Sequence, residues 1–389
     1  MKDNVRVTYH YKNRERGTTR LWLAWPGKHA EEMITTCSPL EVTTIVDQEI
    51  AYFELAEEES VELSYSRGKY KKDESRLSQE ERAFYLRSTI LSPIVDEMEQ
   101  LAQKITAGSN TNLEKAKTLF YYLVDEFQYV YPPKSRGAAS FLLEKKGDCG
   151  EYSFLYTALC RSLEIPCRTV IGSWAVGKIQ AHVWNEVYIE ESGWIPVDCS
   201  MANIQKKKKW QFLLSDIKTL PWRKYFGSTE GQRVVFATDA EIPLEPAYEE
   251  LEEDRLQTSF FDIDGKPFYW GYKTVEGAAP YMQPAYIRFS EKNLEEPAAK
   301  IDSKSYLGEW VVKETGFRRF TFLLKRISIA VVVIGVILGL IVDHKFLGAA
   351  TNFALVLAAG TFLARRERPL LFGVLTGLFM LGFLAAVSG

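Results

Sequence analysis

The sequence predicts an α+β protein in three parts. These are an N-terminal antiparallel β domain, a mixed domain of helices and strands, and a C-terminal segment of three membrane-spanning helices. Three observations predict this fold class. Apolar and polar residues alternate near the N-terminus, apolar residues recur at three- and four-residue spacing from about residue 80, and long apolar runs fill the chain from residue 327 onward.

The N-terminal part contains four short alternating stretches that are rich in Val, Thr, Tyr and Trp. Gly, Pro or Asp residues separate them, which is typical of strands joined by tight turns. Alternation places every second side chain on the same face, so each stretch can cover a core with one face. We therefore predict an antiparallel β domain over 1–72, with strands at 5–11, 19–25, 50–55 and 61–65.

A second domain is expected over 80–300, after a polar linker at 72–80. Two helices are predicted at its start, at 93–105 and 112–124, with Asn110 or Asn112 as the N-cap of the second. Strands and a further helix follow around the polar motifs described below.

Three apolar runs at the C-terminal end are long enough to cross a bilayer, which takes about 20 mainly apolar residues per helix. Only short polar breaks separate them, so we predict helices that run up, down and up. A juxtamembrane linker at 301–326 precedes the membrane segment, 327–389, whose helices are expected at 327–342, 346–364 and 370–388.

Lysines and arginines near the ends of the spans set the predicted orientation. Basic residues gather before the first run and in the second break, whereas the first break holds one lysine. We expect a multi-pass membrane protein with its large soluble part in the cytoplasm and its C-terminus outside. No charged residue lies at mid-depth of a span, which favours an anchor over a transport path. The basic residues before the first run are Lys313, Arg318, Arg319, Lys325 and Arg326.

Composition excludes several other classes of protein. The net charge of −3 argues against nucleic acid as a partner, because phosphate binding needs a basic field. Five cysteines in 389 residues are too few for a disulfide scaffold. The first residues lack the apolar core of a signal peptide, which agrees with the expected cytoplasmic location.

Two polar segments admit a functional and a plain interpretation. Asp262 and Asp264 resemble the start of a calcium loop, but the twelfth position would be Lys273 where a bidentate glutamate is required. A hairpin around Asp264 and Gly265 is favoured instead. The four lysines 206–209 are interpreted as a solvated loop, with contact to an anionic leaflet as the lesser alternative.

The candidate nucleophile is Cys149. It follows Gly147 and Asp148 and precedes an apolar stripe at helical spacing, so it is expected at a helix N-terminus. Unpaired backbone N–H groups at such an end stabilise a thiolate and can bind an oxyanion. Cys160 and Cys167 are instead expected to be buried as small apolar side chains.

Two further motifs supply a base and a carboxylate. His182 opens a predicted strand, and Asp198 ends another that begins at Gly193. Adjacent strands can bring the two side chains together, with Asp198 orienting His182 for a nucleophile. A zinc site formed by Cys149, His182 and Asp198 is the alternative, but no closely spaced Cys or His pair supports it.

These motifs together resemble the transglutaminase-like superfamily. The resemblance covers about 110–230, and the β domain resembles the N-terminal domain of bacterial members. It implies a papain-like α+β fold with a Cys-His-Asp triad, in a bacterial membrane-anchored type of protein. The strings that carry it are 147–149, 158–168, 182–188 and 193–198, with Cys167 standing where the family usually has alanine.

Carried over by position, the resemblance implies that Cys149 is the nucleophile, His182 the general base and Asp198 the residue that orients it. Tyr129, or Tyr131, is the weaker candidate for an oxyanion donor beside the backbone N–H of Cys149.

The expected function is that of a membrane-anchored cysteine enzyme, a protease, amidase or acyltransferase. It acts on protein or peptide amides through a thioester, which water hydrolyses or an amine resolves. No cofactor or metal is predicted, and the expected partners are a protein or peptide substrate and the lipid bilayer. The alternative is a membrane-tethered peptide-binding module that has the same fold and no turnover.

Overall fold

The computed structural model of the chain describes residues 5–14, 16–27, 30–67, 76–131, 133–174, 181–208, 219–231, 233–248, 262–263, 266–267, 285–288, 309–313, 316–342, 344–365 and 369–388. These residues form two compact units, each of which is described by itself. One unit ends at Lys313, and the other holds three long C-terminal helices.

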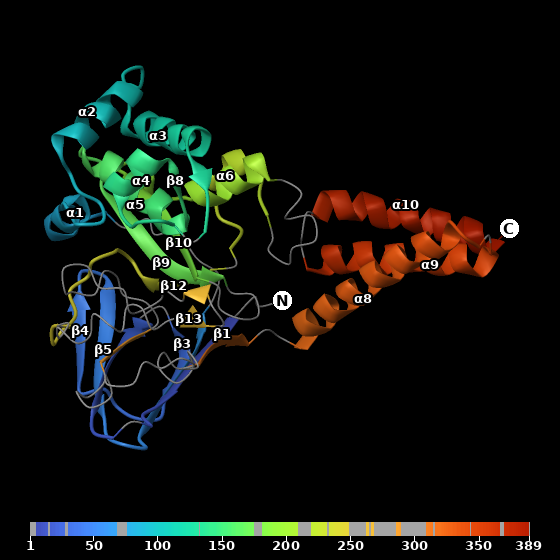
Figure 1. The fold of residues 1–389 in the computed structure, drawn as a ribbon, viewed down its shortest axis with the longest axis horizontal. Coiled ribbons are helices and arrows are strands. Elements are labelled where there is room, and N and C mark those ends of the chain that lie inside the picture. Colours follow the sequence, from blue (N-terminus) through green and yellow to red (C-terminus); the bar gives the residue numbers. More distant parts are fainter. Residues whose placement is uncertain are drawn as a thin grey trace. The chain divides into compact units, whose positions relative to one another are not determined.

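Two antiparallel four-stranded sheets form the N-terminal part of the first unit (Figure 1). The four predicted strands lie within β1, β2, β5 and β6, which confirms the antiparallel β region. The first sheet has the order β16-β1-β6-β3, formed by Glu309–Lys313, Val5–Lys12, Ser60–Arg67 and Glu31–Thr35. The second has the order β15-β2-β5-β4, formed by Ala285–Arg288, Thr19–Trp25, Gln48–Leu55 and Glu41–Ile45.

Both sheets take an outer strand from much later in the chain. β16 pairs with β1, with Tyr9 opposite Trp310, although its residues were expected in the juxtamembrane linker 301–326. β15 pairs with β2 although its residues were expected in the second domain. Local alternation cannot reveal such partners, because the pairing joins segments hundreds of residues apart. The division into 1–72 and 80–300 stays a prediction.

Four helices lead into the second part of this unit. The predicted helices 93–105 and 112–124 are confirmed as α2 and α3. The N-cap of α3 is Thr111 rather than Asn110 or Asn112, because its hydroxyl accepts the N–H of Glu114 at 3.2 Å while the Glu114 carboxylate accepts the N–H of Thr111 at 3.1 Å. The helices are α1 Gln79–Leu86, α2 Asp96–Ile105, α3 Asn112–Glu126 and α4 Ala138–Glu144.

An antiparallel sheet of four strands lies beside helix α5. The amide of Asn185 in β10 donates to the carbonyl oxygen of Ser153 at 3.0 Å and to the hydroxyl of Thr157 at 2.9 Å, which ties the sheet to α5. The sheet has the order β11-β10-β9-β12, formed by Gly193–Val197, Ala181–Ile189, Cys167–Trp174 and Arg233–Ala237. Helix α5 spans Cys149–Arg161, and α6 spans Cys199–Lys207.

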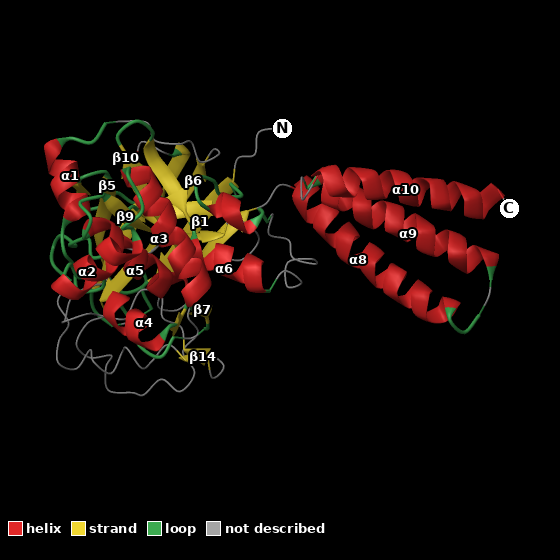
Figure 2. Cartoon of the chain, turned by 90° about the horizontal axis from the view of Figure 1, so that it is seen from above, coloured by secondary structure: helices red, strands yellow, loops and turns green. Residues whose placement is uncertain are grey.

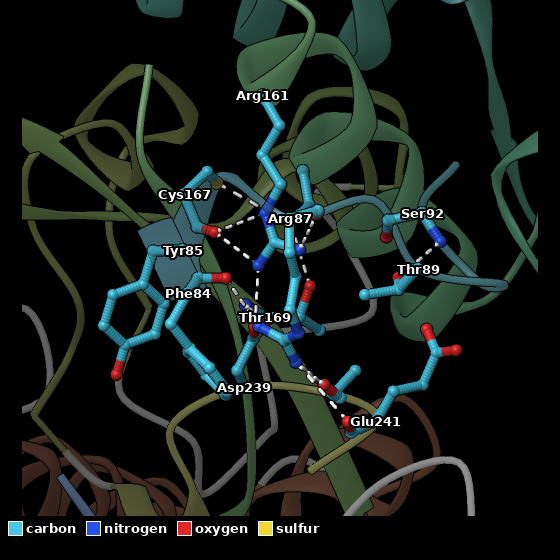
Figure 3. A network of polar contacts seen from close by, with 12 residues as sticks. Phe84, Tyr85, Arg87, Thr89, Ser92, Arg161, Cys167, Thr169, Asp239 and Glu241 are labelled. Atoms are coloured by element: carbon cyan, nitrogen blue, oxygen red, sulfur yellow. Dashed lines mark hydrogen bonds and ion pairs between the residues drawn. The ribbon is translucent and has the colours of Figure 1, made fainter. Parts of the chain in front are cut away.

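The end of α5 far from Cys149 is fixed by a buried arginine. Arg161 donates to Asp239 at 2.6 Å and to the carbonyl oxygen of Cys167 at 2.7 Å (Figure 3). Arg87 reaches the same Asp239 carboxylate at 2.7 Å. Because both partners of the Arg161–Asp239 pair are almost fully buried, the pair sets the position of α5 against β9.

Some predicted features lie wholly or partly outside the described residues. β13 Asp262–Ile263 pairs antiparallel with β14 Lys266–Pro267, as the predicted hairpin requires, but residues 264 and 265 of its turn are outside. Residues 72–75 of the expected linker 72–80 are outside as well, and so is Lys209 of the lysine run.

The second unit consists of α8 Gly316–Gly339, α9 Lys345–Ala364 and α10 Pro369–Ser388. Helix α9 contacts both α8 and α10 and lies between them (Figure 2). All three are long and apolar enough to span a membrane, which agrees with the three predicted runs. α8 begins earlier than the expected residue 327, because the basic stretch before that run is already helical.

Candidate active site

Cys149 is the first residue of α5, as the sequence predicts. Asp148 caps the helix, because its carboxylate oxygen Oδ1 accepts the N–H of Gly150 at 2.8 Å, and Glu151 completes a capping box. The cap leaves Cys149 at the turn between β8, Lys146–Gly147, and the helix, where its side chain is half-buried. A thiol held at this point lies at the end of the helix where the backbone N–H groups have no partner within the helix.

A half-buried arginine, Arg136, clamps the turn that carries Cys149. Arg136 Nη1 lies 3.1 Å from both oxygens of Asp148 and 3.0 Å from Oε2 of Glu151. Burial and the nearby Asp148 raise the pKa of Glu151 to about 8, against the opposing effect of Arg136. Sequence reasoning missed Arg136, since nothing in the local pattern links it to a turn twelve residues later.

His182 lies near the start of β10, next to the candidate nucleophile. Its Nε2 is 2.7 Å from Oδ2 of Asp198, which leaves Nδ1 as the ring nitrogen on the side away from that carboxylate. The backbone N–H of the next residue, Val183, acts on the sulfur of Cys149 and lowers the pKa of the thiol. The start of β10 and the start of α5 therefore meet at the thiol.

Asp198 follows β11 and caps α6. Its Oδ1 accepts the N–H of Met201 at 2.8 Å and the hydroxyl of Ser200 at 2.9 Å. Although burial opposes ionisation, His182 and Arg233 lower the pKa of Asp198 below its usual range. The carboxylate is held as an anion in one orientation by donors on both oxygens.

The ionisation of the thiol and the imidazole differs from the sequence expectation. A helix N-terminus favours a thiolate, yet burial and the neighbouring Asp148 raise the pKa of Cys149, against the opposing effects of the Val183 amide and Arg136. Burial also lowers the pKa of His182, more than Asp198 raises it. Desolvation thus favours a neutral thiol beside a neutral imidazole.

Tyr129, the weaker candidate for an oxyanion donor, lies beside Cys149. It ends β7, Gln128–Tyr129, which pairs in parallel with β8 so that Tyr129 stands opposite Gly147. Burial raises the pKa of its hydroxyl, and the charges of Cys149 and Asp148 raise it further. Tyr131 is 61% exposed.

Two tryptophans hold the imidazole of His182. The ring centroid of Trp174 lies 4.5 Å from that of His182 with 23° between the planes, and Trp184 lies 5.8 Å away at 19°. The two rings stack on His182 and exclude water from it. Trp184 belongs to the recognised motif, but Trp174 precedes it in β9 and carries no local signal.

The described residues hold no group of three or more His, Cys, Asp and Glu side chains that could bind a metal ion. His182 and Asp198 meet through a direct hydrogen bond. The arrangement suits acid–base and nucleophilic chemistry, because a thiol, an imidazole and a fixed carboxylate follow one another.

Comparison with known proteins finds a family match over the part of the chain that holds this site. Residues 99–199 match the model of the transglutaminase-like superfamily. A peptide-N(4)-(N-acetyl-beta-glucosaminyl)asparagine amidase from Drosophila melanogaster is 33% identical over 98 residues, which is 22% of this chain and 15% of that protein. The chain therefore spans less than a sixth of the length of this curated relative.

Solved structures show weaker likeness. A protein from Cytophaga hutchinsonii, described as a candidate cysteine protease, is 17% identical over 51% of this chain and 77% of its own, with a TM-score of 0.39. The periplasmic domain of TgpA from Pseudomonas aeruginosa is 17% identical over 51% and 75%, with a TM-score of 0.36. The family match includes Cys149, His182 and Asp198, and the chain carries a transglutaminase-like core.

Proposed function

We propose that the chain is a membrane-anchored cysteine enzyme that acts on protein or peptide amides. Cys149 is the nucleophile, His182 the general base and Asp198 the residue that orients the imidazole. The observation that carries the proposal is the 2.7 Å hydrogen bond between His182 and Asp198, at the start of the strand whose Val183 N–H lowers the pKa of Cys149. The Drosophila relative, by its name an amidase, supports an amide as the substrate.

The reaction follows from the order of the three groups. The thiol proton of Cys149 moves to His182 as sulfur bonds to the amide carbon. The backbone N–H of Cys149 and the hydroxyl of Tyr129 stabilise the oxyanion. His182 then gives its proton to the leaving nitrogen as the C–N bond breaks, which leaves a thioester.

Either water or an amine resolves the thioester. His182 takes a proton from the attacking molecule, the C–S bond breaks, and the proton returns to the sulfur of Cys149. The product is a carboxylic acid after hydrolysis and a new amide after acyl transfer. The two outcomes depend on how well the site excludes water.

Activity of the full chain in detergent tests the proposal. Glutamine- and asparagine-containing peptides supply the amide, released ammonia and newly formed amino groups report hydrolysis, and incorporation of a fluorescent amine reports acyl transfer. We expect Cys149→Ala to lose all turnover and Cys160→Ala to keep it. Turnover that persists in Cys149→Ala would contradict the proposal, and binding without turnover in the unaltered protein would favour the peptide-binding module.

We also propose that the soluble unit faces the cytoplasm and that the C-terminus lies outside. The support is the basic stretch at the start of α8, with Arg319, Lys325 and Arg326, against a single lysine, Lys345, at the start of α9. A reporter that fluoresces only in the cytoplasm, fused after residue 389, is expected to stay dark. Fluorescence from the C-terminal fusion would show that the orientation is the opposite of the proposed one.

A further inference from the structure

A buried arginine shares the carboxylate oxygen that orients His182. Arg233 is the first residue of β12, and its Nη2 lies 2.7 Å from Oδ2 of Asp198. The same oxygen is 2.7 Å from Nε2 of His182. One oxygen of Asp198 thus accepts from two neighbouring groups, one of which is always a cation.

The guanidinium of Arg233 lies in the same tryptophan cluster as the imidazole. Its centre is 4.7 Å from the ring centroid of Trp174 and 4.8 Å from that of Trp184, within the range of a cation–π contact. Register explains part of this, because Arg233 stands opposite Trp174 in the β9–β12 ladder. The two rings therefore fix both partners of Asp198 Oδ2, His182 and Arg233.

A second carboxylate, that of Glu230, shares the positive charge of Arg233. Oε2 of Glu230 lies 2.8 Å from Nη2 and 3.1 Å from Nε of Arg233, and the Glu230 side chain is fully buried. The charge of Arg233 is consequently divided between Asp198 and Glu230. A buried arginine with two carboxylates costs desolvation energy and stays in place only when its hydrogen bonds are well made.

We infer that Arg233 is a positioning residue of the proposed reaction, and the inference rests on that proposed function. Arg233 holds Asp198 Oδ2 in place and withdraws part of its negative charge from His182. Arg233 thus adds to the desolvation that keeps Cys149 a thiol and His182 a neutral imidazole at rest, and the proton moves only when sulfur attacks the substrate.

The charges around His182 agree with this role. Besides burial, Arg233 lowers the pKa of His182, whereas Asp198 and Asp148 raise it. Burial and Asp148 raise the pKa of Cys149. With a weaker base and a weaker acid, proton transfer between the two at rest is unfavourable, so the ion pair is a minor species.

The charge of Glu230 opposes that of Arg233. Removing Glu230 alone and removing both residues should therefore change the basicity of His182 in opposite directions. Without Glu230, the full charge of Arg233 acts on Asp198 and His182 becomes a weaker base. Without both Arg233 and Glu230, the full charge of Asp198 acts on His182, which becomes a stronger base. The groups that act on Glu230 itself are Arg233, Asp198 and the Tyr225 hydroxyl.

The pH dependence of Cys149 alkylation by iodoacetamide, followed by peptide mass spectrometry on the full chain in detergent, is the measurement. The variants are Glu230→Gln, Arg233→Lys and the double variant Arg233→Met with Glu230→Gln, which removes Arg233 together with its second carboxylate and leaves Asp198 facing His182 alone. Arg161→Met is the matched control, because Arg161 and Asp239 form an equally buried pair, at 2.6 Å, at the other end of α5. Thermal unfolding of each variant reports stability separately.

We expect the midpoint of alkylation to fall by about one pH unit in the double variant, the usual effect of one nearby charge, and to rise in Glu230→Gln. Arg233→Lys keeps the charge and should keep the midpoint, while Arg161→Met should lose stability with its midpoint unchanged. An unchanged midpoint in the double variant would overturn the inference. Midpoints that shift in the same direction in the double variant and in Glu230→Gln would also overturn it. If His182→Ala leaves the midpoint of otherwise unaltered protein in place, the proposed function itself fails.

Discussion

Gly172 of β9 stands directly opposite His182 of β10 in the antiparallel register. A Cβ atom on Gly172 would lie 2.1 Å from the carbonyl oxygen of Val234 and 2.7 Å from the ring of Trp184. The missing side chain is what allows the tryptophan to reach across the sheet. The position of His182 thus depends on a glycine in the neighbouring strand.

Gly172→Ala is expected to destabilise the protein by about 1–3 kcal/mol, because the added methyl group forces the backbone of β12 or the Trp184 ring to move. Thermal unfolding measures the loss. Gly108→Ala is the control, since its Cβ would meet nothing within 4 Å, and it should change stability by no more than about 0.5 kcal/mol. Equal stability of the two variants would contradict the packing described here.

Asp198→Asn is expected to separate catalysis from folding. Asparagine caps helices about as well as aspartate, so α6 should remain capped through the N–H of Met201. The charge that orients His182 is lost, and turnover should fall by roughly 10³–10⁴-fold. Initial rates and circular dichroism of the full chain check both parts, and a variant that keeps full activity would remove Asp198 from the proposed triad.

Cys149 should react with a small electrophile faster than Cys160. The Cys149 side chain is half-buried at a helix end, whereas Cys160 is fully buried within α5. Timed alkylation in the folded protein, with each modified peptide quantified, measures the ratio of rates. Faster labelling of Cys160 would show that the thiol at the helix end is closed to reagents.

The raised pKa of Glu151 predicts how the free energy of unfolding depends on pH. Its pKa is raised from 4.5 to about 8, so the folded state keeps a proton that the unfolded chain releases. The free energy of unfolding should therefore fall as the pH rises from about 4.5 to about 8, by at most ~1.4 kcal/mol per pH unit for this group.

Glu151→Gln should flatten that slope, and the exposed Glu97→Gln should leave it as it is. Glu230 has a pKa raised to about 7 and contributes with the same sign over a narrower range, so Glu230→Gln should flatten the slope only below about pH 7. Unfolding midpoints measured across the range test this. A stability that rises through the window in the unaltered protein and in all three variants would show that other groups dominate.

Much of the fold follows from local patterns. Alternation found the strands that became β1, β2, β5 and β6, and apolar spacing found α2, α3 and the three C-terminal helices. The turn at Gly147 and Asp148, with the apolar stripe after it, put Cys149 at the start of α5, and the motif at His182 named the residue that meets Asp198. Each of these depends on a few neighbouring residues.

The remaining features depend on partners that are distant in sequence. β15 and β16 are short, and only their pairing with β2 and β1 defines them. Arg136, Trp174 and Arg233 reach the site from a loop and two strands whose sequences carry no catalytic signature. The ionisation of Cys149 depends on how deeply the fold buries it, which a helix-end argument omits.

β16 ends at Lys313 and α8, the first of the three candidate membrane-spanning helices, begins at Gly316, so three Cα–Cα steps join a strand of the N-terminal sheet to that helix. At 3.8 Å per step the join reaches roughly 11 Å at full extension. In the proposed membrane-anchored enzyme, a link this short gives the soluble unit a high effective concentration toward anything anchored in the same bilayer. Selection among substrates would then depend on where a target amide lies relative to the membrane as well as on the sequence around it.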